Sequence, residues 1–518
     1  MASWAISSPH AASTRVGAEL LERGGSAIDA ALASAAALCV CLPNNVAVGG
    51  DLFALLHTPD GGLRALNSSG PAAAAASAAA LRSRHGRRLP LKGADTVTVP
   101  GLLAGWSALR GAGATADWNR LLGPAIELAR GGVEVDPQVA AALQNNRDLL
   151  AADPGMAATF FSGGQPLAAG ELLRQPRLAV TLERIAADGA GAFYDGPIGE
   201  AWLRTMNARG SVLGRGDLAG FAPEWSAPVL VSNADQELVL SPPNSQSFLV
   251  GAILAELERC GQPLCDPLAA DGAPAFARAG FHAREARDRL LADPRFAAVP
   301  VAGILAGEID LSAGDPTSGT RSTPGPIGDG DTIGLVARDI NGLAVTLIQS
   351  VFGSFGSGIC CPETGIIAQN RGSFFSLEPG HPNEIEPGKR PAHTLSPVMI
   401  RERGALRHVI GTRGGTTQAQ ILAGVIQRLR LGDGPAAAVG APRILSGSPD
   451  PNADQDAVHA EDDAPTAAIA ALGDAGYAVE LTAARQPEAG EVQVISIGSD
   501  GAVAAGSDPR SDGLALSG

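Results

Sequence analysis

Aromatic residues and clustered positive charge are both scarce in this sequence. Phe, Trp and Tyr make up only 4% of the 518 residues, and alanine runs such as Pro71–Leu81 indicate a compositional bias more than a special architecture. No stretch concentrates Lys and Arg, and the net charge is −15, which opposes binding to a phosphate backbone. We therefore expect no nucleic-acid partner.

The sequence also lacks an apolar run long enough to span a membrane. The longest, Ala30–Leu42, is shorter than the roughly 20 residues that a spanning helix needs. It follows Asp29 in a helical pattern, which predicts a buried helix. The N-terminus shows no basic start followed by an apolar stretch and a small-residue cleavage site. We expect no membrane contact and a cytoplasmic location.

Two kinds of catalytic signature are missing as well. There is no Gly-x-Ser-x-Gly elbow, which argues against a conventional serine hydrolase. The histidines are scattered and no cysteine has zinc-site spacing with a nearby histidine, so we expect no metal, no cofactor and free buried thiols. The cysteines are Cys39, Cys41, Cys260, Cys265, Cys360 and Cys361.

What the chain does contain is enough apolar sequence for a large core. It is 45% hydrophobic and 18% charged, and its length allows about two to four domains. Apolar spacing predicts helices over His10–Arg23 and Ala27–Leu42 and a strand over Leu52–His57, and helical periods then continue to about Arg204. The first part of the chain is therefore expected to be mostly helical, with strands at its edges.

The pattern changes after Leu311. Residues 311–330 are crowded with Pro, Gly, Ser, Thr and Asp, which predicts an exposed, mobile loop running to residue 331. From Thr332 onward a sheet-rich unit with helices is expected. Its predicted elements are the strands Ile333–Ala337 and Leu343–Gln349, joined as a hairpin through Asn341-Gly342, the strands Ser396–Arg401 and Arg407–Gly411, and the helix Thr417–Leu431.

The junction Asp331-Thr332 suggests a specific chemistry. A threonine at a chain start carries both a nucleophilic hydroxyl and an α-amine that can take the hydroxyl proton, directly or through a water. Only cleavage before Thr332 could expose that amine, and a loop running into the first position of a strand is the arrangement that such cleavage requires. A plain structural threonine at a strand start is the competing interpretation.

A second candidate group lies at Gly414 and Gly415, where a predicted strand ends in a glycine turn and a helix begins. Backbone N–H groups at a helix N-terminus favour negative charge, as an oxyanion hole requires. A tight turn that merely needs glycine is the alternative.

Taken together, these residues resemble the gamma-glutamyltranspeptidase family of N-terminal nucleophile hydrolases, from near residue 8 to residue 513. The resemblance rests on many short segments in the family's order. They are Gly24–Ala31, Gly49–Ala54, Thr98–Gly101, Phe193–Gly196, Asp331-Thr332, Phe355–Gly358, Gly365–Asn370, Pro387–Pro391, Gly414-Gly415 and Gly506–Gly513.

The resemblance implies an α+β fold, a four-layer αββα sandwich formed by an autocleaved precursor. The fragments 1–331 and 332–518 would stay together as a heterodimer, with further dimerisation left open. Thr332 would be the nucleophile, Gly414 and Gly415 the oxyanion-hole amides, and Ser350 the hydroxyl residue that hydrogen-bonds the terminal threonine. For Ser350, a strand serine facing solvent is the competing interpretation.

Several positions depart from the family pattern for holding a γ-glutamyl group. Pro71 stands where an arginine that grips the α-carboxylate is expected, and proline cannot make that contact. The remaining departures are Phe352 for an asparagine, Arg371 for a glutamine, Phe374 for an aspartate, and His393-Thr394 for a serine pair.

The pattern is more similar to a divergent branch that includes oxamate amidohydrolases and acylase-like members. Arg371, His393, Thr394 and Arg413 could form a different anion pocket, with solvent-facing roles as the alternative. We therefore expect a hydrolase or acyltransferase acting on a small, oxamate-like amide that carries an acid group. The alternatives are a true γ-glutamyl transferase or glutathione hydrolase, and an uncleaved family member that only binds a metabolite.

Overall fold

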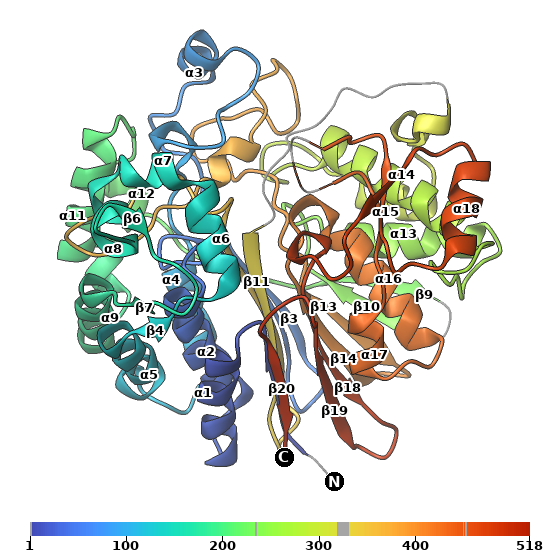
Figure 1. Ribbon diagram of the computed structural model, residues 1–518, viewed down its shortest axis with the longest axis horizontal. Coiled ribbons are helices and arrows are strands. Elements are labelled where there is room, and N and C mark those ends of the chain that lie inside the picture. The colour runs from blue at the N-terminus through green and yellow to red at the C-terminus, as the bar shows by residue number, and fades with distance from the viewer. Residues whose placement is uncertain (1–2, 234–235, 319–330, 449, 451–452) are drawn as a thin grey trace.

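Two antiparallel sheets lie face to face at the centre of the protein (Figure 1). The computed structural model describes residues 3–233, 236–318, 331–448, 450 and 453–518. The first sheet has the order β20 (Leu514–Ser517), β1 (Ala5–Ser8), β11 (Asp331–Arg338), β12 (Ala344–Phe352), β2 (Asp51–His57), β3 (Leu63–Ser68), β8 (Glu224–Ser226). The second has the order β19 (Val503–Ser507), β18 (Val492–Ile497), β14 (Ala405–Thr412), β13 (Val398–Glu402), β10 (Gln236–Leu240), β9 (Val229–Asn233).

Helices cover the outer face of each sheet, which gives the four layers of an αββα sandwich (Figure 1). The first sheet is covered mainly by α1 (Ala11–Glu22), α2 (Ala27–Cys41), α4 (Leu102–Gly111), α5 (Trp118–Gly131) and α9 (Pro176–Asp188). The second is covered by α13 (Phe248–Arg259), α14 (Ala273–Leu290), α16 (Gln418–Arg430) and α17 (Pro435–Gly440). The α+β sandwich expected from the sequence is confirmed.

Shorter elements complete the outer layers. The helices among them are α3 (Ala78–His85), α6 (Pro137–Asn145), α7 (Arg147–Ala151), α8 (Pro154–Phe160), α10 (Gly191–Tyr194), α11 (Pro197–Ala208), α12 (Arg215–Ala219), α15 (Val301–Ala306) and α18 (Thr466–Asp474). The strands are β4 (Val133–Glu134), β5 (Phe161–Ser162), β6 (Gln165–Pro166), β7 (Leu172–Leu173), β15 (Ile444–Ser446), β16 (Val458–Glu461) and β17 (Val479–Thr482).

Small and aliphatic side chains fill the space between the two sheets. Leu55 and Val336 from the first sheet pack with Met399 and Val409 from the second. The sheets come closest where β11 crosses β14, because a Cβ on Gly334 would lie 2.5 Å from the Thr412 nitrogen. Glycine at residue 334 therefore lets the start of β11 approach the end of β14, which is the region of the candidate site.

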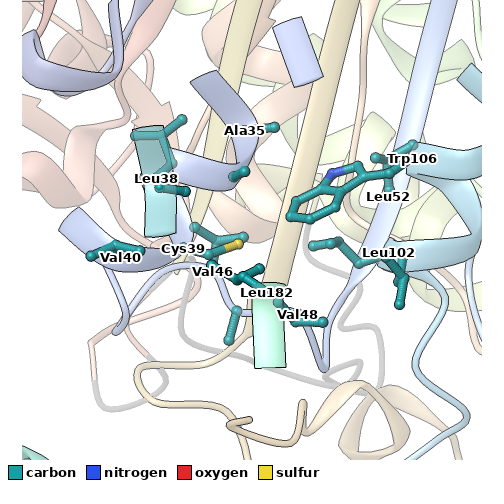
Figure 2. Packing of buried hydrophobic residues seen from close by; sticks show 14 of the residues in the cluster. Ala35, Leu38, Cys39, Val40, Val46, Val48, Leu52, Leu102, Trp106 and Leu182 are labelled. Atoms are coloured by element: carbon teal, nitrogen blue, oxygen red, sulfur yellow. The ribbon is translucent and has the colours of Figure 1, made fainter. Parts of the chain in front are cut away.

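The helix α2 is buried along its whole length. It begins with a capping box, in which the Ser26 hydroxyl accepts from the Asp29 N–H and the Asp29 carboxylate accepts from the Ser26 N–H. Ala35 and Cys39 face the layer in which Trp106 of α4 lies (Figure 2). The apolar run Ala30–Leu42 thus belongs to a core helix, as predicted.

The elements predicted for residues 332–518 are confirmed with small changes in their bounds. Strand β11 extends beyond its predicted range at both ends, β12 begins one residue later and ends three residues later than predicted, and α16 begins and ends one residue inside its predicted range. Residues before 332 also supply β1, β2, β3 and β8 of one sheet and β9 and β10 of the other. The first part of the chain therefore contributes to the central sheets and not only strands at its edges.

Two expectations need correction. Residues 311–318 are not simply an exposed loop, because they form short 3₁₀ turns over Ser312–Gly314 and Pro316–Ser318 in which Gly314 and Asp315 are buried. Residues 319–330 of that predicted loop lie outside the described residues, and its last residue, Asp331, is buried as the first residue of β11. The six thiols are free, but Cys260 is exposed whereas the others are buried. In the described part of the chain, no helix is both long and apolar enough to cross a bilayer.

Candidate active site

Thr332 lies near the start of β11, fully buried beside an irregularity in the strand pairing. Asp331 pairs with Phe352 and Ile333 with Gln349, so two residues of β12 lie opposite Thr332. Such bulges re-aim side chains and are frequent near active sites. Here the bulge brings Ser350 toward Thr332, and the Thr332 hydroxyl donates a hydrogen bond to Ser350 Oγ over 3.1 Å.

Ser350 connects the threonine to the peptide bond before it. Its hydroxyl donates to the carbonyl oxygen of Asp331 over 2.6 Å and accepts from the Phe352 N–H over 2.7 Å. A donor on that oxygen polarises the carbonyl that links Asp331 to Thr332. The serine is therefore not solvent-facing, and the structure brings the predicted pair Thr332 and Ser350 together.

The two glycines of the proposed oxyanion hole follow β14 directly. Gly414 has φ of 139° and Gly415 has φ of 51°, and α16 begins three residues later at Gln418. At Gly414 a Cβ would also lie 2.3 Å from Ile421 Cδ1. Both positions therefore require glycine for backbone reasons, as the tight-turn interpretation holds. A strand end turning into a helix is equally the geometry on which the oxyanion-hole hypothesis rests.

Arg413 immediately precedes these glycines and holds Asp331. Its Nη2 lies 2.6 Å from Asp331 Oδ1, and its Nη1 lies 2.9 Å from Glu491 Oε1 and 3.0 Å from Gln138 Oε1. Burial acts to lower the pKa of Arg413, but Asp331 and Glu491 outweigh it and hold that pKa above its ordinary value. Burial also raises the pKa of Glu491 to about 7, against the charge of Arg413. In the uncut chain this guanidinium is thus engaged by protein groups.

Three of the positions that depart from the family pattern form one cluster. The Arg371 guanidinium lies 4.0 Å from the centroid of the Phe352 ring, and the Phe352 and Phe374 rings meet edge to face at 5.5 Å. Phe352 also has φ of 80°, an unusual backbone for a bulky residue and one that is most common at functional sites. Arg371 donates from Nη1 to Thr394 Oγ1 over 3.2 Å.

The rest of the Arg371 guanidinium has no partner within the described residues. Nε and Nη2 are buried and make no hydrogen bond there, and both lie on one edge of the planar group. Burial lowers the pKa of Arg371 to about 9, and the negative charge of Asp51 opposes that shift. A buried cation with an unused pair of parallel donors fits a carboxylate.

Asp51 and His393 lie beside this cation. Asp51 accepts hydrogen bonds from the Gly70 and Gly101 N–H groups and from Gln369 Nε2, and its Oδ2 lies 3.3 Å from His393 Nε2. Burial raises the pKa of Asp51 to about 7, and Arg371 opposes the rise. Burial holds the pKa of His393 well below its ordinary value, and Arg371 adds to that effect. His393 is therefore neutral at pH 7, and the cation available to an acid is Arg371.

Sequence reasoning missed three residues of this region. Asp51 was recognised only as part of a matching segment, although its carboxylate accepts a hydrogen bond from the N–H of Gly70, the residue before Pro71. Gln246 donates from one nitrogen to both the Thr394 and Gly415 carbonyl oxygens, each over 3.0 Å. Glu491 holds Arg413. Gln246 and Glu491 lie in segments that carry no motif, so only the folded chain reveals their contacts.

One possible ligand cluster contrasts with the expectation of no metal. Ligand atoms of His10, Asp136 and Asp512 lie within 4.8 Å of one another. However, His10 caps α1 by accepting from the Ala12 N–H, and Asp136 caps α6 by accepting from the Gln138 N–H. These two contacts give His10 and Asp136 structural roles as helix caps.

Two sheets between helical layers, with a buried threonine at the start of a central strand, define the class of N-terminal nucleophile hydrolases. The chain belongs to the gamma-glutamyltranspeptidase family, whose model, described as Gamma-glutamyltranspeptidase, matches residues 13–518. The family resemblance and the enzymatic class expected from the sequence are thus confirmed.

Relatives with curated names extend over almost the whole chain. It is 34% identical to the oxamate amidohydrolase proenzyme of Klebsiella pneumoniae, with 98% of this chain and 97% of the relative covered. It is 31% identical to the glutathione hydrolase-like YwrD proenzyme of Bacillus subtilis, with 99% and 98% covered. The crystal structure of cephalosporin acylase from Bacillus halodurans superposes with a TM-score of 0.89 at 28% identity, covering 99% of this chain and 96% of that one. These matches confirm the similarity to the divergent branch.

Proposed function

We propose that this chain cuts itself before Thr332 and then acts as an N-terminal-threonine amidohydrolase or acyltransferase on a small amide carrying an acid group. The observation that carries the substrate class is the buried Arg371 guanidinium, whose Nε and Nη2 have no partner within the described residues. Its neighbour Phe352 is hydrogen-bonded through its amide to Ser350, which in turn contacts Thr332.

The proposed turnover uses groups already described. After cleavage, the α-amine of Thr332 takes the proton of its own hydroxyl, and Oγ1 attacks the amide carbon of the substrate. The Gly414 and Gly415 N–H groups stabilise the oxyanion, and the amine departs with a proton. Water, or an acceptor amine, then releases the acyl group from the threonine. Ser350 keeps the threonine hydroxyl oriented through the 3.1 Å hydrogen bond.

The apolar groups around Arg371 favour an acid without a neighbouring ammonium. Phe352 lies against the cation and Phe374 packs on Phe352, where the family pattern has polar residues, and Pro71 replaces the expected arginine. A γ-glutamyl donor brings an ammonium as well as a carboxylate, and an unpaired charge in a closed site costs on the order of several kcal/mol. A compact acid amide, of which oxamate is the simplest, needs only one cationic partner. An oxamate amidohydrolase among the relatives supports this class.

The test compares substrates on fully cleaved enzyme. We expect kcat/KM for oxamate to exceed that for glutathione and γ-glutamyl anilide. Arg371→Met should lower kcat/KM for oxamate by roughly 10²-fold or more, because it removes one partner of a buried charge pair. Oxamide, which has the same size without the acid, should be hydrolysed equally by both forms. Arg401→Met, which removes an arginine that pairs with Glu237, serves as the control variant.

Other results would favour the alternatives. Ordinary transpeptidase efficiency on glutathione, with oxamate ignored, would identify a γ-glutamyl enzyme in spite of Pro71. A single full-length band on a denaturing gel would favour an uncleaved, non-catalytic binder. N-terminal sequencing of the smaller fragment should read Thr-Ile-Gly-Leu-Val, and any other start would contradict Thr332 as the nucleophile.

A further inference from the structure

Arg413 contacts Asp331, the residue whose peptide bond to Thr332 would be cleaved. Its Nη2 lies 2.6 Å from the side-chain carboxylate of Asp331, the residue immediately before Thr332. We propose that Arg413 is a positioning residue for maturation: by holding the Asp331 side chain, it fixes the peptide bond before Thr332 for cleavage. This inference rests on the proposed cleavage at that bond.

Asp331 is held from two directions. Ser350 donates to its backbone carbonyl over 2.6 Å, and Arg413 binds its side chain over the same distance. The Ser350 contact restrains the carbonyl and the Arg413 contact restrains the side chain, so both groups on the Cα of Asp331 are held in addition to its pairing with Phe352. A charge-assisted contact between buried groups is among the stronger hydrogen bonds in proteins.

Arg413 is itself rigidly placed. Its backbone N–H donates to the Glu491 carbonyl oxygen over 3.0 Å, and its Nη1 bonds the Glu491 and Gln138 side chains. Gly414 and Gly415 follow it directly. The contact between Arg413 and Asp331 therefore ties the residue before the cleaved bond to the strand end that leads into Gly414 and Gly415.

The cleavage step balances without any bond to Arg413. Thr332 Oγ1 attacks the carbonyl carbon of Asp331, the bond from that carbon to the Thr332 nitrogen breaks, and the nitrogen leaves as an amine carrying the hydroxyl proton. The resulting ester is hydrolysed by water to the Asp331 α-carboxylate and the free Thr332 hydroxyl. Arg413 acts only on the geometry of the starting peptide, through the Asp331 side chain.

The hydrogen bonds of Arg413 also distinguish its role from that of Arg371. Its two η-nitrogens already bond carboxylate or amide oxygens, whereas Arg371 keeps an unused edge. Asp331 would carry a second carboxylate after cleavage, facing a guanidinium that Glu491 still shares. The contact between Arg413 and Asp331 thus suits the uncut chain, in which Arg413 would position the peptide bond for cleavage.

The experiment follows cleavage of freshly made precursor over time on denaturing gels. Asp331→Asn and Arg413→Met should each lengthen the half-time at least tenfold. If the two side chains act through one contact, the double variant should be no slower than the slower single variant. Arg413→Lys keeps the charge and should recover part of the rate. Arg443→Lys, a change at a buried arginine that pairs with Asp508 instead, should leave the half-time within about threefold of the wild type.

Several outcomes separate this inference from the proposed function. If wild type remains one band, the cleavage proposal fails. If wild type is cut but Asp331→Asn is cut at the same rate, the positioning role is wrong while the proposed function stands. If the double variant is slowed by the product of the two single effects, the side chains act independently and the positioning role is likewise wrong. Because Arg413→Met risks misfolding, thermal unfolding is recorded for every variant, and the near-isosteric Asp331→Asn decides the question if Arg413→Met does not fold.

Discussion

Gly415 lies just before α16 and has a left-handed backbone conformation, which few other residue types can adopt without strain. Its φ is 51°, a conformation that a β-branched side chain adopts only with strain. We predict that Gly415→Val displaces the amides proposed to form the oxyanion hole and lowers kcat by roughly 10²- to 10³-fold, the usual effect of losing one oxyanion donor.

The measurement is steady-state kinetics on cleaved enzyme. Gly404→Val is the matched control, because Gly404 also has positive φ, 83°, but lies in the turn between β13 and β14 with open space around it. It should lose stability without losing kcat. Near wild-type turnover in correctly cleaved Gly415→Val would show that these amides do not stabilise the oxyanion.

At the same scale, the sequence singled out the residues of the Arg371 cluster without showing how they meet. Phe352, Arg371 and Phe374 each departed from the family pattern, yet nothing in their spacing said that the two rings and the guanidinium touch. Their contact depends on Phe352 having positive φ, a backbone state that no local pattern indicates. Arg413 was predicted to bind substrate, and its contact with Asp331 came only from the fold.

Among the elements, β11 and β14 determine whether the site forms at all. A Cβ on Gly334 would lie 2.5 Å from the Thr412 nitrogen and 2.7 Å from the Gly411 carbonyl carbon, both backbone atoms that cannot move aside cheaply. We predict that Gly334→Ala destabilises the protein by about 1–3 kcal/mol, the range for overpacking, and slows cleavage before Thr332 by separating β11 from the glycine turn.

Urea unfolding measures the loss of stability in Gly334→Ala, and a cleavage time course measures the slower cleavage. Gly424→Ala in α16 is the control, because its new Cβ would lie 3.5 Å from Phe276 Cζ, an ordinary contact, and alanine is favoured in a helix. It should unfold at the same or a higher urea concentration and cleave normally. Equal stability of Gly334→Ala and wild type would contradict the tight crossing.

Periodicity was sufficient to predict these elements but not their pairing. The β11–β12 hairpin followed from the alternating apolar residues around Asn341-Gly342, and α2 from its apolar run after Asp29. The bulge that places Ser350 opposite Thr332 could not be predicted, because it depends on register near the far end of the hairpin. The 3₁₀ turns at 312–318 were missed because short polar turns leave no apolar period.

On the scale of the whole molecule, the two proposed fragments are interleaved. The first sheet mixes strands of both fragments, since β20, β12 and all of β11 except Asp331 come from residues 332–518, and β1, β2, β3 and β8 from residues 1–331. We predict that the cleaved fragments elute together in gel filtration and separate only in denaturant, because parting them would expose the strand edges and the shared core.

Gel filtration of cleaved protein with and without about 6 M urea provides the measurement. Fragment 332–518 produced alone should not fold into a species with the native near-ultraviolet signal, since β11 and β12 would lack β1 and β2 as neighbours. The uncut Thr332→Ala variant is the control, and it should elute at the same volume as the cleaved pair in buffer. Dissociation in buffer alone would contradict this prediction.

The burial of Thr332 has a consequence for the order of events in the cell. Its strand β11 pairs with β1 and β12 and approaches β14, and β1 pairs in turn with β20 at the end of the chain, so these surroundings are complete only when nearly the entire chain has been synthesised. A ribosome-bound or misfolded chain would hold no exposed reactive amine. Under the proposed maturation, only a molecule that has folded completely is cleaved before Thr332. Because this cleavage is irreversible, hydrolytic activity is confined to molecules that have reached the folded state.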